Sequence, residues 1–272
     1  MRDVFLLSES QMEKIRPHFP LAHGMPRVDD RRVLSRIVYV IRNGLQWKDA
    51  PKAYGPHQTL YNRFIRWSRL GVFDRIFVAL TEQAGRSKRL MIDVTHLKAH
   101  RTAASLLKKR LFPRHIGRTK GGLNSKLHAV CDSQGRPVRL HLTAGQVSDF
   151  KGADVLLADL PNGTEEVIGG RGYDSNRIRP SLAERSITAC IPPKKNRKSK
   201  PPYDWRLYKK RHLIENMFAK LKDWRPVATR YDRSAHTFMS AIHIALSFSA
   251  DVWKSVPNAA IDLQSPSVSY VK

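Results

Sequence analysis

The segment 208–222 has the sequence YKKRHLIENMFAKLK, in which apolar side chains recur at the interval of an α-helix. At about 100° per residue, four apolar side chains share one stripe that would enter a core: Leu207, Ile214, Phe218 and Leu221. Along the edge of that stripe, within about 60°, lie four polar side chains: Tyr208, Arg211, Glu215 and Lys222. The carboxylate of Glu215 would therefore be held rigidly at the rim of a core. By periodicity alone, this is also the pattern of an ordinary amphipathic helix with ion pairs on its surface.

The spacing of the four polar residues, Tyr-x2-Arg-x3-Glu-x6-Lys, resembles the signature of DDE transposases of bacterial insertion sequences. More narrowly, residues 211–232 are similar to the IS5 family. Two earlier segments, 92–101 and 117–130, are similar to the same family and occur in the same order. The resemblance covers nearly the whole chain. It implies an RNase H-like catalytic domain that cuts and rejoins DNA strands with divalent metal ions.

The charge of the chain is strongly positive. Its 272 residues include 49 Lys and Arg against 23 Asp and Glu, which gives a formal net charge of +26, and 41% of the residues are hydrophobic. This hydrophobic content suffices for the core of one large domain or two modest ones. A net charge so far from zero indicates a polyanionic partner. The basic residues are spread along the chain and form no juxtamembrane cluster, so nucleic acid fits better than a membrane surface.

The cysteines and the apolar runs indicate neither a zinc site nor membrane insertion. Cys131 and Cys190 lie far apart, and neither has a second Cys or a His at zinc-finger spacing. We expect both to be small buried residues in strands. The N-terminal apolar run is too short for a signal peptide, and the run 238–252 is too short for a membrane span. We therefore expect a cytoplasmic, nucleoid-associated protein.

Residues 1–86 predict a small helical, helix-turn-helix-like domain that binds DNA. Capping and glycine signals place four helices: about 8–17, 29–43, 57–70 and 72–84. The third helix carries Arg63, Arg66 and Arg69 at intervals of three, as a helix that enters a DNA groove needs. Arginines at this spacing are also common on solvated helix faces.

Residues 87–255 predict an α/β domain, and residues 256–272 a C-terminal tail. Five short apolar or β-branched runs have the composition of strands: Leu90–Asp93, Leu127–Asp132, Val138–Leu142, Glu166–Gly169 and Ile187–Ile191. The second and third form an antiparallel hairpin, and helices near 152–160 and after Ser175 separate the later strands. A mixed five-stranded sheet flanked by helices follows. This order matches the RNase H-like fold that the resemblance implies, with Glu215 on a helix after the last strand.

Two segments are more basic than their surroundings. Residues 98–120 carry eight Lys or Arg, with Lys120 at the end, and residues 194–202 have the sequence KKNRKSKPP. Like charges at this density repel one another unless a phosphate backbone neutralises them. We therefore expect both segments to contact DNA, and solvated loops are the alternative.

The expected chemistry depends on carboxylates. Two divalent ions roughly 4 Å apart, Mg²⁺ or Mn²⁺, can relieve charge on the attacking and leaving oxygens of a phosphodiester, and such ions prefer carboxylate ligands. By the resemblance, Asp93, at the end of the first strand, and Glu215 are catalytic and bind these ions. A lone Asp at a strand end, by contrast, more often caps the following turn.

The third carboxylate of the family is missing from this chain. IS5 relatives carry Asp-Arg/Lys-Gly/Ala-Tyr-Asp after the fourth strand, where this chain has the segment 170–174, GRGYD. Gly170 offers no side-chain ligand, and the loss of a shared carboxylate from a two-metal site costs orders of magnitude in rate. Asp174 is a weak substitute, because it lies four residues further on, past a glycine.

By the same resemblance, Tyr208, Arg211 and Lys222 contact DNA phosphates or position the terminal nucleotide, which suits a phenol, a guanidinium and an ammonium. The alternative is that Arg211 and Lys222 only balance the charge of Glu215 on the helix surface. We also expect Arg63, Arg66 and Lys120 to bind DNA.

Three functions stay open from the sequence. The first is an insertion-sequence transposase, acting as a homodimer on double-stranded DNA, that binds terminal inverted repeats and transfers them to target DNA. The second is a catalytically inactive, transposase-derived DNA-binding protein. The third is a general basic nucleic-acid-binding protein, which would need neither Asp93 nor Glu215 in this context.

Overall fold

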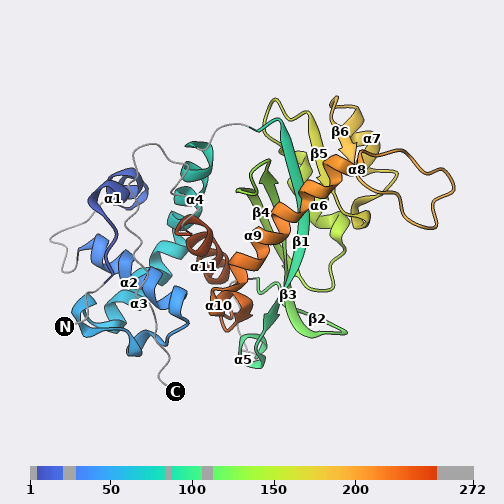
Figure 1. Cartoon of the computed structure of the whole chain (residues 1–272). Helices are drawn as coiled ribbons and strands as arrows, with labels where there is room; N and C mark the ends of the chain where they lie inside the picture. The colour runs from blue at the N-terminus through green and yellow to red at the C-terminus, as the bar shows by residue number, and fades with distance from the viewer. Residues whose placement is uncertain (1–4, 21–28, 84–86, 106–112, 250–272) are drawn as a thin grey trace, which may run out of the picture.

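The computed structural model describes residues 5–20, 29–83, 87–105 and 113–249 (Figure 1). Its first part contains the four predicted helices: α1 Glu9–Ile15, α2 Asp30–Asn43, α3 His57–Arg69 and α4 Val72–Gln83. Gly44 and Gly71 follow α2 and α3 with φ of 64° and 67°, a left-handed conformation that glycine adopts without a steric penalty. Short 3₁₀ turns complete this part: η1 Arg16–His18, η2 Trp47–Asp49 and η3 Lys52–Tyr54.

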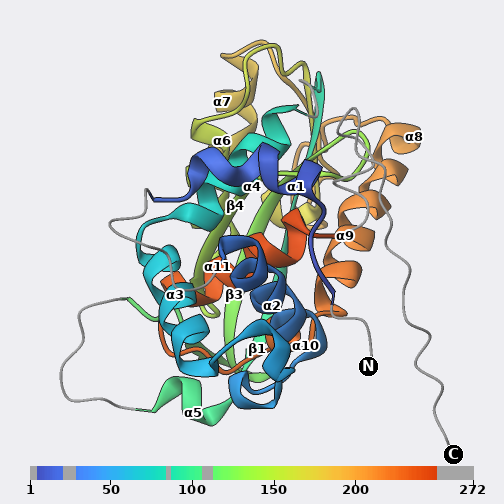
Figure 2. The same cartoon turned by 90° about the vertical axis from the view of Figure 1, so that its left-hand side faces the viewer.

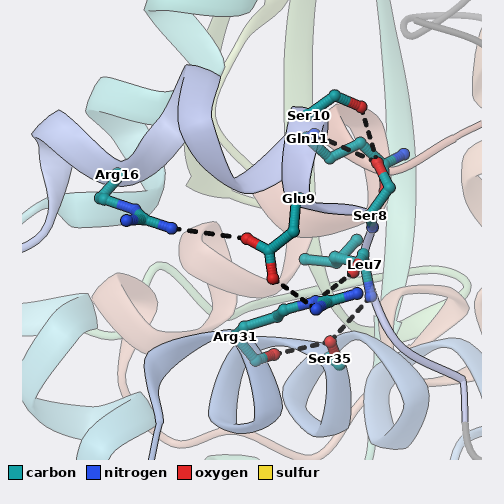
Figure 3. A network of polar contacts seen from close by, with 8 residues as sticks. All are labelled: Leu7, Ser8, Glu9, Ser10, Gln11, Arg16, Arg31 and Ser35. Carbon is teal, nitrogen blue, oxygen red and sulfur yellow. Dashed lines mark hydrogen bonds and ion pairs between the residues drawn. The ribbon is translucent and has the colours of Figure 1, made fainter.

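The start of α1 is fixed by side chains that reach back to the backbone and across to α2 (Figure 3). Ser8 caps the helix by accepting a hydrogen bond from the backbone N–H of Gln11, and the Gln11 side chain returns one to the backbone of Ser8. Glu9 forms ion pairs with Arg16 and Arg31, and Leu7 donates its N–H to Ser35 Oγ at 3.0 Å. These contacts hold the N-terminal segment against α2.

The sheet has the predicted mixed five-stranded arrangement at its centre, in the order β4-β3-β1-β5-β6. Its strands are β1 Arg89–Ala99, β3 Gly122–Asp132, β4 Pro137–Ala144, β5 Glu166–Gly169 and β6 Thr188–Cys190. Strand β3 is antiparallel to β1 and β4, whereas β1, β5 and β6 run parallel. With the flanking helices, this is the RNase H-like fold.

Two short strands were not predicted. Strand β2, Gly117–Thr119, pairs with β3, and β7, Thr229–Arg230, pairs with β1, so the described part of the sheet has seven strands. Segments of two or three residues carry no periodicity of their own, and these two exist because a neighbouring strand pairs with them. Since β7 follows Glu215 in the chain, Glu215 does not lie after the last strand.

Strand β1 is longer than predicted, which corrects the place of Asp93. The strand pairs with β3 continuously from Leu90 to Lys98, so Asp93 lies within it and not at its end. Because many residues after Asp93 are polar, the sequence did not indicate that the strand continues. In the structure these residues alternate between the two faces of the sheet. On the other side of β1, however, strand β5 ends at Gly169, which pairs with Ile92. Asp93 is therefore the first residue of β1 beyond its last ladder pair with β5.

Helices cover both faces of the sheet. On one face, α6 Asp149–Ala158 and α7 Ile178–Ala183 pack on Leu90 and Ile92 of β1. On the other face, the motif segment packs on Met91 and Leu97. The alternation of these side chains along β1 thus separates two hydrophobic cores. Two further helices are short: α5 Arg101–Ala104 and α10 Arg225–Ala228.

The motif segment is not one uninterrupted α-helix. It consists of α8 Trp205–Tyr208, a 3₁₀ turn η5 Lys209–Arg211 and α9 His212–Lys222. The four apolar side chains predicted to enter the core are buried: Leu207, Ile214, Phe218 and Leu221. The tighter turn that ends with Arg211 has no apolar signature, so periodicity could not place it.

The N-terminal helices and the sheet share one core. Helix α11, Ala235–Ser247, is buried along most of its length and packs against α2, α3 and α4 (Figure 2). The His243 ring stacks on Phe77 of α4 with centroids 5.1 Å apart. One hydrophobic cluster runs from Leu34 of α2 through Phe238 of α11 to Met91 of β1. The proposed boundary at residue 86 and the tail 256–272 lie outside the described residues.

The sequence also predicted that both cysteines are buried in strands and that the apolar run 238–252 does not span a membrane. Cys131 and Cys190 are free and buried in β3 and β6, as predicted. In the described ranges, no helix has both the length and the apolar character needed to cross a bilayer.

Candidate active site

The predicted carboxylates Asp93 and Glu215 are brought together by one guanidinium. Arg211 Nη2 lies 2.7 Å from Asp93 Oδ2, and Arg211 Nη1 lies 2.6 Å from Glu215 Oε1. Packing of α9 across β1 on the Met91 face positions all three side chains (Figure 1). Arg211 and Glu215 are four residues apart, one helical turn, so their pairing is local, whereas the pairing with Asp93 depends on the fold.

The three groups lie in different surroundings. Asp93 is 8% exposed, whereas the Glu215 side chain is 52% exposed. Burial raises the pKa of Asp93 above its ordinary value and Glu215 adds to this, while Arg211 and the Val94 N–H oppose it. Burial alone would lower the pKa of Arg211, but the two carboxylates raise it, so the guanidinium stays charged. Arg211 therefore offsets the formal charge of only one of the two carboxylates.

Gly170 lies directly beside this bridge. A Cβ at this position would meet Arg211 Nε at 3.5 Å and Nη2 at 3.7 Å, which are ordinary van der Waals distances. Its backbone, with φ −70° and ψ 167°, is one that any L-residue adopts. In the described part of the chain, the buried Arg211 Nε has no hydrogen-bond partner. An acceptor is thus missing at the position where the resemblance expects a carboxylate.

A cavity of about 390 Å³ adjoins Asp93, Gly170 and Arg211. One wall is aromatic and comes from α8 and the residues just before it: Tyr203, Trp205 and Tyr208. The Trp205 and Tyr208 rings stack with centroids 5.8 Å apart, and Trp205 remains 55% exposed. A cavity with charged groups on one side and flat rings on another can receive a nucleotide, whose phosphate is anionic and whose base stacks.

Several residues that line this cavity were not predicted. Asp149, at the start of α6, holds the buried Lys126 through an Oδ1–Nζ contact of 2.8 Å. Tyr173, on the 3₁₀ turn η4 Arg171–Tyr173, has a buried hydroxyl with no partner among the described residues. Only Trp205 carried a sequence signal, because it lies one turn before Tyr208. Asp149 and Tyr173 come from separate elements, α6 and η4, and no local spacing could have indicated them.

Asp174, the weak substitute for the missing carboxylate, is engaged elsewhere. Its Oδ1 accepts from Arg179 Nε at 2.8 Å, and its Oδ2 accepts from the backbone N–H of Lys194 at 2.8 Å. Burial would raise the pKa of Asp174, but these bonds and Arg197 lower it below its ordinary value. With 1% of its side chain exposed and both oxygens bonded, Asp174 stabilises the loop and does not line the cavity.

The other predicted DNA contacts lie away from the cavity. Lys222 is exposed near the end of α9, about 10 Å along the helix from Glu215. Arg63 pairs with Asp30 at 2.7 Å, whereas Arg66 is exposed on α3. Lys120 is exposed in the turn between β2 and β3. Of the basic segment 98–120, the part 106–112 lies outside the described residues.

Two family models match the chain. Residues 7–77 match the model described as "Putative transposase of IS4/5 family", and residues 85–248 match "Transposase DDE domain". The second match alone covers more than half of the chain.

Two insertion-sequence proteins are similar to just under half of this chain, and a solved structure is aligned over most of it. A protein of Brucella ovis described as "Putative transposase for insertion sequence element IS6501" is 40% identical over 124 residues, which are 45% of this chain and 95% of that protein. A Burkholderia cepacia protein described as "Putative transposase for insertion sequence element IS402" is 30% identical over 140 residues, 45% of this chain and 64% of that protein. The crystal structure of the Mos1 mariner paired end complex with Mn is 12% identical over 88% of this chain and 82% of that chain, with a TM-score of 0.26. This score is too low to support an argument.

Proposed function

Because the chain belongs to the IS4/5 family of insertion-sequence transposases with a DDE domain, we propose that it binds the terminal inverted repeats of such an element. Asp93 and Glu215 are the retained carboxylates of its strand-cutting site. Membership in the family predicted from residues 92–101, 117–130 and 211–232 is confirmed by these matches.

One observation carries this proposal: Asp93 and Arg211, 118 residues apart in sequence, meet at 2.7 Å, with Glu215 on the same guanidinium. In an ordinary amphipathic helix the ion pairs form on the exposed surface. A pair with a buried carboxylate of a central strand is not expected there. A general basic nucleic-acid-binding protein would not need this arrangement either.

DNA is the partner that the charge and the cavity favour. A net charge of +26 attracts a phosphate backbone, and Tyr208 and Arg211 offer a ring and a guanidinium at the cavity. Arg66, Lys120 and Lys222 are exposed and available to phosphates on other parts of the surface. We assign end recognition to the helical segment 1–86 and strand cleavage to residues 87–255, with two copies acting together on DNA.

The DDE domain implies dependence on a divalent metal ion, and Mg²⁺ or Mn²⁺ is the proposed ion. The residues present do not fit a site built from three carboxylates. Gly170 has no donor, and Arg211 already bridges Asp93 and Glu215. Within the described ranges, no three His, Cys, Asp or Glu side chains are grouped so that they could hold a metal ion. We therefore propose that strand cleavage by this chain is weak.

Gly170 also favours a second candidate function. A chain that retains the DNA-binding surfaces but lacks one carboxylate would bind the ends of the element without cutting them. Such a protein would compete with an active copy for the inverted repeats.

One experiment separates both of these functions from the third candidate, a general basic nucleic-acid-binding protein. The measurement is gel-shift competition between a labelled duplex that carries the terminal inverted repeat of the flanking DNA and unlabelled duplexes of the same or of shuffled sequence. We expect the repeat to compete at least tenfold better. Equal competition by both duplexes would leave a general basic nucleic-acid-binding protein.

A further inference from the structure

The basic loop that joins β6 to α8 is anchored to the domain at its start. Residues 194–200, KKNRKSK, carry five cations and no acid, so their charges repel one another. The backbone N–H of Lys194 nevertheless donates to Asp174 Oδ2 at 2.8 Å, and Arg197 Nε donates to the same carboxylate at 3.2 Å. Arg197 Nη1 also donates to Asn176 Oδ1 at 2.7 Å. One buried carboxylate therefore fixes the first half of this loop.

Three cations of the loop take no part in this anchor. Lys195, Lys198 and Lys200 are exposed, and the bonds to Asp174 use none of them. Asp174 is already shared by Arg179 and Arg197, so it does little to offset the charge of the three lysines. Together they form a local concentration of positive charge, which a phosphate backbone can neutralise.

The loop adjoins the cavity of the candidate site. It begins after Pro192 and ends before Tyr203, and both of these residues line that cavity together with Asp93. Figure 1 shows the loop between β6 and α8, at the end of the molecule opposite to α1–α4. A duplex that is bound by α1–α4 and has its reacting phosphate at Asp93 would therefore continue past the cavity toward the loop.

We propose that Lys195, Lys198 and Lys200 bind phosphates of the duplex DNA that flanks the inverted repeat, on the far side of the phosphate to be cut. This inference rests on the proposed function, because binding of the repeat fixes which phosphate lies at the cavity. A lysine presents a point charge to a phosphate, and contacts with phosphates carry no direct sequence information. The contact is therefore independent of the sequence of the flank.

Fluorescence anisotropy with two duplexes tests this surface. One duplex stops at the outer end of the inverted repeat, and the other continues into the flank for about 10 base pairs, one helical turn. We expect the flank to raise the affinity of the chain as given about tenfold or more at low salt, equally for two unrelated flank sequences.

The loop variant combines Lys195→Gln, Lys198→Gln and Lys200→Gln. It should lose the gain in affinity that the flank provides, whereas its affinity for the duplex without a flank should change much less. The slope of log affinity against log salt for the flanked duplex should also fall by about 3, one for each lost phosphate contact.

The matched control removes the same charge elsewhere on the surface, through Lys48→Gln, Lys52→Gln and Lys120→Gln, at lysines that are also exposed. This control should keep the gain from the flank. The inference is overturned if the flank adds no affinity for the chain as given, if the loop variant keeps the gain, or if the control loses it equally. Loss of preference for the repeat over shuffled sequence, measured with duplexes that lack a flank, would overturn the proposed function instead.

Discussion

Arg211 of the motif segment holds Asp93 of the central strand with an Nη2–Oδ2 distance of 2.7 Å. The same guanidinium holds Glu215, so one cation neutralises part of the charge of both carboxylates.

Removal of the guanidinium should destabilise the chain. Arg211→Ala leaves Asp93 buried without its ion pair, and we expect the free energy of unfolding to fall by about 1–3 kcal/mol. Urea unfolding at pH 7 measures this. Arg66→Ala, an exposed arginine on α3, is the control and should change stability by less than about 0.5 kcal/mol. Equal losses in the two variants would show that the bridge contributes nothing to stability.

Asp174 should contribute a pH-dependent part of stability. Its folded pKa is lowered, so its stabilisation is fully present above its unfolded value, about 4, and is lost as pH falls through the folded pKa. Asp174→Asn should cost about 2–4 kcal/mol at pH 7, because Arg179 and Arg197 lose a buried partner. Its unfolding free energy should also fall less steeply below about pH 4.

Asp159→Asn, at a carboxylate that is 78% exposed, is the control for this measurement. If Asp174→Asn and Asp159→Asn showed the same acid profile, the structural role assigned to Asp174 would be wrong.

DNA affinity should depend strongly on salt. A chain of net charge +26 displaces counterions from the phosphate backbone on binding. We expect the affinity for random duplex to fall by roughly 10³-fold between 50 and 200 mM salt. A titration followed by fluorescence anisotropy measures the slope of log affinity against log salt. A flat plot would contradict an electrostatic interface.

The helical segment should not be separable from the rest of the chain. Helix α11 buries its surface against α2, α3 and α4, so a fragment of residues 87–272 would expose Phe238 and Ile242 to water. We expect this fragment to aggregate or to lose its cooperative thermal transition, whereas the full chain shows one. Native-like melting of the fragment would show that the shared core is dispensable.

The sequence predicted those elements whose signals are local. Ser8, Gly44 and Gly71 mark helix boundaries by capping chemistry and by positive φ, and the structure has helices that begin or end there. The five central strands were also found. Strand β1 was cut short because Thr95, His96 and Lys98 are polar, yet it continues because β3 pairs with them.

From the sequence, only those site residues that belong to the family motifs could be named. Asp93, Arg211 and Glu215 were named from their motifs, but the guanidinium bridge between them results from the packing of α9 on β1. Asp149 of α6 and Tyr173 of η4 line the same cavity, and only the folded chain brings them there. The structure also shows a role of Asp174 that its sequence position did not reveal, because Arg179 and Arg197 bind it.

We propose that Gly170 removes a carboxylate from a site that otherwise retains Asp93 and Glu215. The most direct test is strand nicking of a duplex that carries the element's own end, measured with Mg²⁺ and separately with Mn²⁺. Gly170→Asp introduces no backbone strain, because φ at this residue is −70°. We predict that Gly170→Asp nicks at least 100-fold faster than the chain as given, and that adding Glu215→Ala abolishes the gain. Equal nicking by the chain as given and by Gly170→Asp would contradict the account.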